Sequence, residues 1–152
     1  MSVAQFSTPA IPQPAEVFHH ILMTTDFSEA SQRALAGAIA LAAQNHAHLS
    51  VVHVLHTDWR YEILDNPPEI DLERIDAQRR LEAATRDMGF GRVLDSIIIR
   101  RGPVPQKVLA LAEEVGADLL VIGRGPQDGH FGRFTEHAYG IIRQSPCPVV
   151  SI

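Results

Sequence analysis

The sequence has little of what secreted, membrane-spanning or nucleic-acid-binding proteins need. It holds a single cysteine, Cys147, in 152 residues, and one cysteine cannot form a disulfide within the chain, which fits a reducing cytoplasm. Its longest weakly polar stretch, ALAGAIALAA, is far too short to cross a bilayer. The 18 acidic side chains outnumber the 13 basic ones and give a formal charge of -5. We therefore expect no membrane span and no sequence-independent binding to nucleic acid.

The N-terminal segment also lacks the features of a secretory signal, because it has neither a basic start nor an apolar core. Pro9, Pro12 and Pro14 lie there among Ser, Thr and Gln, so we predict an irregular leader over residues 1–17. Residues 18–152 are expected to form one domain, which is long enough to bury a hydrophobic core without disulfides.

Apolar runs rich in β-branched residues alternate with segments whose apolar residues have helical spacing. Strands that alternate with helices predict an α/β fold, in which right-handed crossovers build a five-stranded parallel sheet with helices on both faces. In such sheets, ligands bind beyond the carboxyl ends of the strands, where the strand order reverses. The predicted strands are 18–25, 48–56, 94–102, 118–123 and 145–152, and the predicted helices are 26–46, 71–89, 103–117 and 134–144.

Two short segments stand at predicted carboxyl ends of strands. TTDFS follows the first strand and GRGPQDGHFGR follows the fourth, and they would be neighbours if these two strands pair. In TTDFS, Thr24, Thr25 and Asp26 end the strand, where an aspartate can accept hydrogen bonds from a ribose or a base. Asp26 can equally cap the following helix, and the two roles are compatible.

The second segment is rich in glycine but matches neither common phosphate motif. It has no lysine followed by serine or threonine, as a Walker loop requires, and Asp128 stands where a dinucleotide fingerprint has its third glycine. Glycine still lets a backbone approach a ligand closely, and N–H groups at a helix start attract anions. The alternative is a flexible connection without a ligand. The glycines are Gly123, Gly125, Gly129 and Gly132.

Neither a catalytic centre nor a metal site is expected. FSEAS does not match the G-x-S-x-G elbow of hydrolases. Zinc sites need three or four converging ligands, whereas the eight histidines are scattered along the chain. The pattern therefore favours a protein that binds a ligand without turning it over.

Several separate segments resemble universal stress proteins. HHILMTTDFSEASQRALAGAIALA resembles the opening of that family, HLSVVHV its second strand, and ADLLVIGRG, GRF and IIRQSPCPVVSI its C-terminal half. The resemblance covers nearly all of residues 18–152. It implies the adenine nucleotide alpha hydrolase-like fold with strand order 3-2-1-4-5, usually as a dimer. Some members bind ATP and others do not.

The resemblance also implies which residues would hold the adenosine part of a nucleotide. In the family, residues near the first strand hold adenosine, and the glycine segment surrounds the phosphates. By position in the family pattern, Thr24, Thr25 and Asp26 would face adenine and ribose. Leu49 would line the adenine pocket, with Ile122 and Gly123 on its opposite side.

The phosphate half departs from the family pattern, which is a glycine, two residues, a second glycine, nine residues, and then glycine with serine or threonine. Pro126 stands at the second glycine, and Thr135 and Glu136 fall on the Gly-Ser step. Glu136 would repel a phosphate, and two arginines could offset this by forked contacts to phosphate oxygens. The candidate phosphate-binding residues are Arg124, Gly125, Gly129, Gly132, Arg133, Thr135 and Glu136.

These expectations leave three functions open. The first is a stress-response regulator that binds ATP or another adenine nucleotide, with or without magnesium, through an altered phosphate loop. The second is a nucleotide-free dimeric interaction or scaffold protein of the same fold, and the third is an enzyme with weak ATPase activity. The apolar terminal strand CPVVSI predicts a homodimer through this strand, and a regulator would also need a protein partner.

Overall fold

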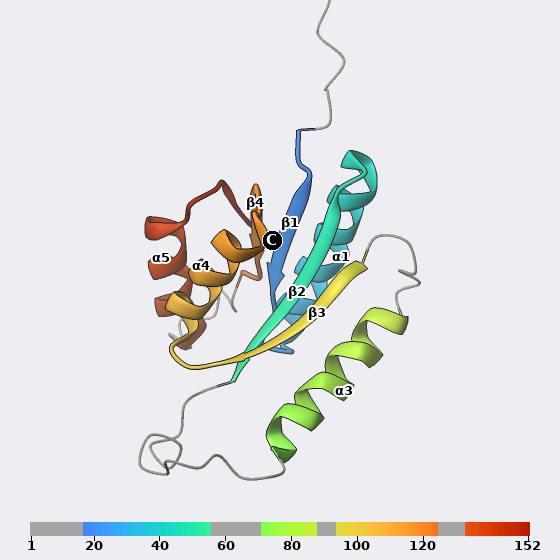
Figure 1. Cartoon of the computed structure of the whole chain (residues 1–152), viewed down its shortest axis with the longest axis vertical. Coiled ribbons are helices and arrows are strands. Elements are labelled where there is room, and N and C mark those ends of the chain that lie inside the picture. Colours follow the sequence, from blue (N-terminus) through green and yellow to red (C-terminus); the bar gives the residue numbers. More distant parts are fainter. Residues whose placement is uncertain (1–16, 56–70, 88–93, 125–132) are drawn as a thin grey trace, which may run out of the picture.

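The computed structural model describes residues 17–55, 71–87, 94–124 and 133–152, with the backbone alone for 94 and 133–136 (Figure 1). Most of the predicted leader, residues 1–16, lies outside the described residues. Val17 is the first described residue, and its N–H donates to the side-chain oxygen of Asn45 over 3.2 Å. Among the described residues, no helix has the length and apolar character that crossing a bilayer requires.

Five strands form one parallel sheet in the order β3-β2-β1-β4-β5, which confirms the predicted fold class and strand order. The last strand is shorter than predicted, because Pro148 has no N–H to donate and β5 begins only after it. The strands are β1 (His20–Thr24), β2 (His48–Leu55), β3 (Leu94–Arg101), β4 (Leu119–Ile122) and β5 (Val149–Ser151).

Helices cover both faces of the sheet, as the alternation of strands and helices predicted. Figure 1 shows α1 and α3 on one side of the strands and α4 and α5 on the other. The bounds are α1 (Glu29–Asn45), α3 (Leu72–Asp87), α4 (Val104–Val115) and α5 (Arg133–Gln144).

Helix α1 begins and ends at residues with the expected capping chemistry. The side chain of Ser28, the N-cap, accepts a hydrogen bond from the N–H of Ser31 over 3.2 Å. At the other end His46 adopts the left-handed conformation with φ of 51°, and its N–H reaches the carbonyls of Ala42 and Ala43. These caps place the start of α1 directly after the end of β1.

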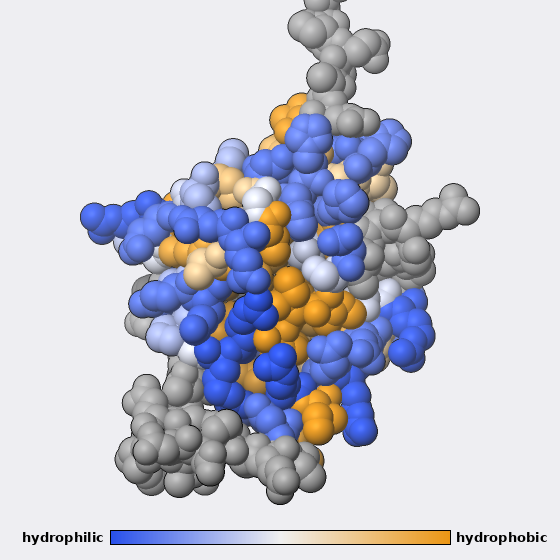
Figure 2. Space-filling view, in the orientation of Figure 1, coloured by the Kyte–Doolittle hydropathy of each residue, from blue (hydrophilic) through white to orange (hydrophobic). Residues whose placement is uncertain are grey.

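The core has one apolar cluster on each face of the sheet. Ile21 and Met23 of β1 belong to the cluster under α1 and α3, whereas Leu22 belongs to the cluster under α4 and α5. This division follows from the alternation of side chains along a strand. Figure 2 shows a band of apolar side chains at the centre of one face, where β2 and β3 run in Figure 1. On β3, Ile97 and Ile98 are only partly buried.

The C-terminal residues lie at the opposite edge of the sheet from β3. Among the described strands β5 pairs with β4 alone, and Ile152 continues that pairing by donating its N–H to the carbonyl of Ile122 over 3.0 Å. The side chain of Ile152 lies over Gly37 of α1 and fills the space that a Cβ there would take. Val150 and Ile152 nevertheless remain 36% exposed. The last strand thus leaves an apolar edge in contact with solvent.

Candidate functional site

The two segments singled out in the sequence lie side by side at the carboxyl edge of the sheet. β1 and β4 are neighbours, and Thr24 pairs with Ile122 at their last position. Gly123 comes next, where a Cβ would lie 3.1 Å from the backbone nitrogen of Ser31 in the first turn of α1. A glycine thus lets the end of β4 pass close to α1 without a tight contact to its backbone. The end of β4, the end of β1 and the start of α1 therefore meet.

The turn from β1 into α1 is held by a hydrogen bond at each backbone N–H. Thr25 donates to the carbonyl of Val52 over 2.9 Å, and Asp26 donates to Oγ of Ser31 over 3.1 Å. Phe27 donates to Oγ1 of Thr25 over 3.1 Å, although its φ of 64° lies in the left-handed region. A bulky residue there costs roughly 1–3 kcal/mol. The surrounding bonds hold the turn in this conformation.

Asp26 uses one of its two carboxylate oxygens within this turn. Oδ1 accepts the N–H of Ser28 over 2.9 Å and also the hydroxyl of Ser31. Partial burial alone would raise the pKa of Asp26, but the hydrogen bonds from Ser28 and Ser31 lower it below its ordinary value. Oδ2 has no hydrogen-bond partner among the described residues. The cap of α1 is therefore Ser28 and not Asp26, which instead braces the turn before the helix through Oδ1.

A histidine that the sequence analysis did not select supports the same turn. Nδ1 of His53, on β2, lies 2.7 Å from the carbonyl oxygen of Thr25. A carbonyl can only accept, so Nδ1 carries the proton. The imidazole lies 4.4 Å from the ring of Phe27, and the Arg80 guanidinium lies 4.2 Å above that ring. Burial lowers the pKa of His53, and this outweighs the opposing effect of the bond to Thr25.

Leu49 does not reach this edge. It pairs with Ile21, three residues before the last pair of β1, and is fully buried in the cluster under α1 and α3. At about 3.3 Å per residue, that places it roughly 10 Å from the carboxyl end of β1. The part of β2 that extends past β1 contains Val54, which is 8% exposed and shares the α4 face with Ile122. Val54, and not Leu49, is thus the apolar residue of β2 near the carboxyl end of β1.

The candidate phosphate residues are described only in part. Gly125, Gly129 and Gly132 lie outside the described residues. α5 begins at Arg133, so Thr135 and Glu136 belong to its first turn, and only their backbone is described. Arg124 is exposed, and its N–H donates to the carbonyl of Ile152 over 2.6 Å. The contacts that these residues make with a phosphate therefore stay a prediction.

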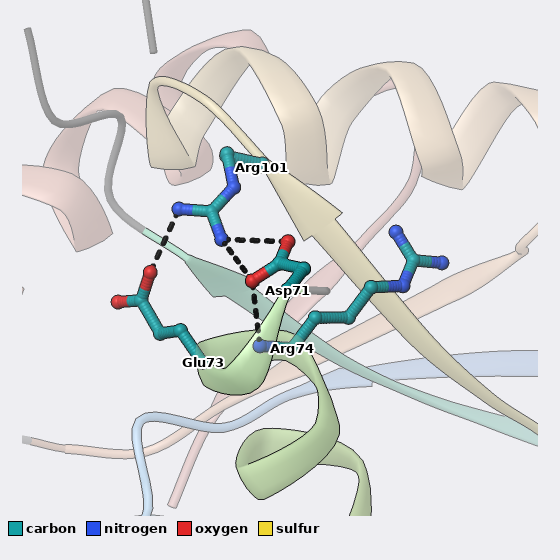
Figure 3. A network of polar contacts seen from close by, with 4 residues as sticks. All are labelled: Asp71, Glu73, Arg74 and Arg101. Carbon is teal, nitrogen blue, oxygen red and sulfur yellow. Dashed lines mark hydrogen bonds and ion pairs between the residues drawn. The ribbon is translucent and has the colours of Figure 1, made fainter. Parts of the chain in front are cut away.

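A second polar cluster that the sequence analysis missed lies where β3 ends (Figure 3). One nitrogen of the Arg101 guanidinium donates to both carboxylate oxygens of Asp71 over 3.0 Å, and the other donates to Glu73 over 2.8 Å. Arg74 adds only its backbone N–H to Asp71, and its side chain points away. Burial would raise the pKa of Asp71, but these hydrogen bonds lower it below its ordinary value. The cluster ties the start of α3 to the sheet.

The family model of the universal stress protein family matches residues 18–152. The chain belongs to the universal stress protein family. A curated relative, universal stress protein A homolog 1 of Coxiella burnetii, is 29% identical over 138 residues, which cover 89% of this chain and 96% of that one. In the described part of this universal stress protein, no group of three or more His, Cys, Asp or Glu side chains is placed to hold a metal ion.

Two crystal structures illustrate the likeness in three dimensions. A member of the universal stress protein family from Burkholderia pseudomallei is 26% identical, has a TM-score of 0.65, and aligns over 91% of this chain and 98% of its own. A universal stress protein in complex with cAMP is 25% identical, has a TM-score of 0.60, and aligns over 90% and 97%. The likeness therefore extends over nearly the whole domain of each.

Proposed function

We propose that this universal stress protein is a stress-response regulator that binds an adenine nucleotide at the carboxyl edge of β1 and β4. The observation that carries the proposal is the carboxylate of Asp26. Its Oδ1 is held by Ser28 and Ser31, while its Oδ2 has no partner among the described residues. The protein thus presents an oriented hydrogen-bond acceptor beside Gly123, where the ends of two neighbouring strands meet.

The chemistry of this acceptor suits a ribose. The lowered pKa of Asp26 keeps its carboxylate ionised at neutral pH, and a hydrogen bond from a sugar hydroxyl to an ionised carboxylate is stronger than one between neutral groups. The strand order reverses at β1, because β2 lies on one side of it and β4 on the other. Open α/β sheets bind ligands beyond the carboxyl ends of the strands at such a point. The cAMP complex of the relative that is 25% identical supports an adenine nucleotide as the ligand class.

The phosphate half of the site is proposed to be weaker than in the family pattern. Glu136 stands in the first turn of α5, where its charge competes with a phosphate for the helix N-terminus. Arg124 and Arg133 would offset this repulsion through forked contacts to phosphate oxygens. We therefore expect a nucleotide with a short phosphate tail to bind at least as well as ATP.

Calorimetric titration of the full chain with ATP, ADP, AMP and cAMP, with and without magnesium, tests the proposal. Asp26→Asn removes the charge and should weaken adenine-nucleotide binding by about tenfold or more, since a hydrogen bond to a charged group contributes about 1.5–3 kcal/mol. Asp118→Asn also replaces a carboxylate by an amide, but where β1 begins and not where it ends. It should leave the affinity for adenine nucleotides unaltered. Equal affinities for wild type and Asp26→Asn would contradict the site.

The same titration separates the remaining alternatives. Absence of binding for all four nucleotides would favour the nucleotide-free scaffold protein. Release of phosphate from ATP on addition of magnesium would favour the weak ATPase, whereas we propose a binding protein without turnover. An affinity that does not change with magnesium would remove the metal from the proposal.

We also propose that the protein forms a homodimer through β5, and that the regulator acts on a protein partner still to be identified. Within the described part of the chain β5 has a strand on one side only, and Val150 and Ile152 are partly exposed. An unpaired edge with apolar side chains favours pairing with a second copy. Sedimentation should give a dimer at micromolar concentration, and Val150→Lys should shift it to monomer. A wild type that stays monomeric would count against the dimer.

A further inference from the structure

The peptide group between Thr25 and Asp26 is held from both sides. Its carbonyl accepts the Nδ1 proton of His53 over 2.7 Å, and its N–H donates to Oγ of Ser31 over 3.1 Å. The same Oγ donates to Oδ1 of Asp26. The orientation of this peptide therefore sets where the Asp26 carboxylate lies, and His53 is the contact that comes from another strand.

The imidazole of His53 is in turn in contact with an aromatic ring. It lies 4.4 Å from the ring of Phe27 at an interplanar angle of 40°, and the guanidinium of Arg80 lies 4.2 Å from the same ring. Arg80 belongs to α3, Phe27 to the turn after β1, and His53 to β2. The tilted ring contact and the cation–π contact on one phenyl group favour these orientations of the three side chains. The cluster thus joins α3 to the turn that carries Asp26.

We propose that His53 is a positioning residue for nucleotide binding, which holds the Thr25–Asp26 peptide so that Oδ2 of Asp26 faces the ligand, and that Phe27 and Arg80 keep its imidazole in place. The inference rests on the proposed function, because it assigns His53 to the same site. His53 acts through the backbone and touches no ligand itself. A preset acceptor binds more tightly because less conformational freedom is lost on binding.

Replacement of His53 by asparagine and by leucine tests the proposal on the full chain. The amide nitrogen of asparagine can take the place of Nδ1, so His53→Asn should keep AMP affinity within about threefold. His53→Leu cannot donate and should weaken AMP binding about tenfold, the effect of one lost hydrogen bond. Denaturant unfolding of both variants checks that the fold persists. Equal affinities for the two variants would overturn the proposal.

A second measurement works without nucleotide. Amide hydrogen exchange at Asp26 and Phe27 should be faster in His53→Leu than in wild type, and close to wild type in His53→Asn. If the wild type binds no adenine nucleotide, the proposed function fails, and unchanged exchange in His53→Leu would separately overturn the role of His53. Arg80→Met should also speed exchange, whereas Arg79→Met, which removes the same charge from the same helix, should not.

Discussion

The parallel strands begin at one end of the sheet, the amino edge, and finish at the other, the carboxyl edge. At each of these two ends an aspartate accepts hydrogen bonds from backbone N–H groups near β1, but the two carboxylates are used differently. At the amino edge, Asp118 accepts the N–H of His19 on one oxygen over 2.8 Å and that of His20 on the other over 3.0 Å. At the carboxyl edge, Asp26 uses only Oδ1 within the described residues. Both oxygens of the first carboxylate accept backbone N–H groups, whereas Oδ2 of the second has no partner among the described residues.

The polar side chains near the amino edge also satisfy one another. Nε2 of His20 lies 2.7 Å from Oγ of Ser50, which lies 2.8 Å from Oγ of Ser96, so a chain of hydrogen bonds crosses β1, β2 and β3. Ser50 is fully buried. Buried polar groups paired in this way stabilise the fold and leave no acceptor for a ligand. The two ends of the strands therefore differ in whether a carboxylate oxygen is left without a partner among the described residues, more than in residue type.

The largest effect is expected from Leu49→Ala, in the half of β2 near the amino edge. Removing a fully buried leucine side chain should lower the free energy of unfolding by about 2–5 kcal/mol, since Leu49 lies in the core between the sheet and its helices. Urea unfolding measures this loss. The affinity of the folded variant for AMP should not change, and a selective loss of affinity would restore Leu49 to the adenine pocket.

A smaller effect is expected from Asp118→Ala. Two backbone N–H groups lose their acceptor, which should lower the free energy of unfolding by about 1–3 kcal/mol. Nucleotide affinity, measured by calorimetry below the midpoint of unfolding, should stay at the wild-type value. If Asp118→Ala weakened binding as much as Asp26→Asn, the two edges would not differ in the way proposed.

Mild acid should lower the free energy of unfolding by a smaller amount, through one histidine near each end of the strands. Burial lowers the pKa of His20 at the amino edge and of His53 at the carboxyl edge, each below the ordinary value near 6.5. The unfolded chain then binds more protons than the folded one, so stability is full above about pH 6.5 and is lost as the pH falls through the folded pKa values.

Urea unfolding at several pH values between 7.5 and 5 measures this loss. His20→Gln and His53→Asn should each flatten part of the pH dependence, because each removes one titrating imidazole and keeps a hydrogen-bonding group near the nitrogen in use. A variant with the full wild-type pH dependence would show that its histidine does not contribute.

The smallest effect is expected from Asp95→Asn, which lies on β3 near the amino edge. The carboxylate of Asp95 lies 3.4 Å from Nδ1 of His48, and both side chains are largely exposed. Exposed ion pairs contribute little, so the free energy of unfolding should change by at most about 0.5 kcal/mol. Thermal unfolding followed by circular dichroism measures this change. A loss as large as that of Asp118→Ala would mean that the amino edge depends on this exposed pair.

Much of the fold was predictable because it follows from local patterns. Apolar spacing predicted the alternation of strands and helices, and the family resemblance implied the strand order that the structure confirms. The cap of α1 is Ser28, two residues after the aspartate that the sequence offered for this role. The structure places Leu49 in the core, away from the carboxyl edge, and an apolar run alone does not reveal how far one strand extends past its neighbour. Val54 lies five residues after Leu49 and two residues beyond Val52, the last residue of β2 that pairs with β1, so it is near that edge.

The contacts that prepare the candidate site were not predictable in this way. His53 meets Thr25 across 28 positions of sequence, and Arg101 meets Asp71 across 30. Nothing in the periodicity of either segment indicates the partner, since residues far apart in sequence meet only when strands pair and helices pack. His53 was one of eight histidines, and its contacts with Thr25 and Phe27 after folding connect it to the turn that carries Asp26.

The sequence by itself determined the fold class, the family and the two segments that end β1 and β4, because these depend on composition, spacing and motifs along the chain. The tertiary structure alone decided that Asp26 keeps one free oxygen among the described residues while Asp118 keeps none. The physical reason is that a hydrogen bond depends on distance and direction in space. Two aspartates of the same chemistry therefore differ in availability according to which N–H groups the fold brings to them.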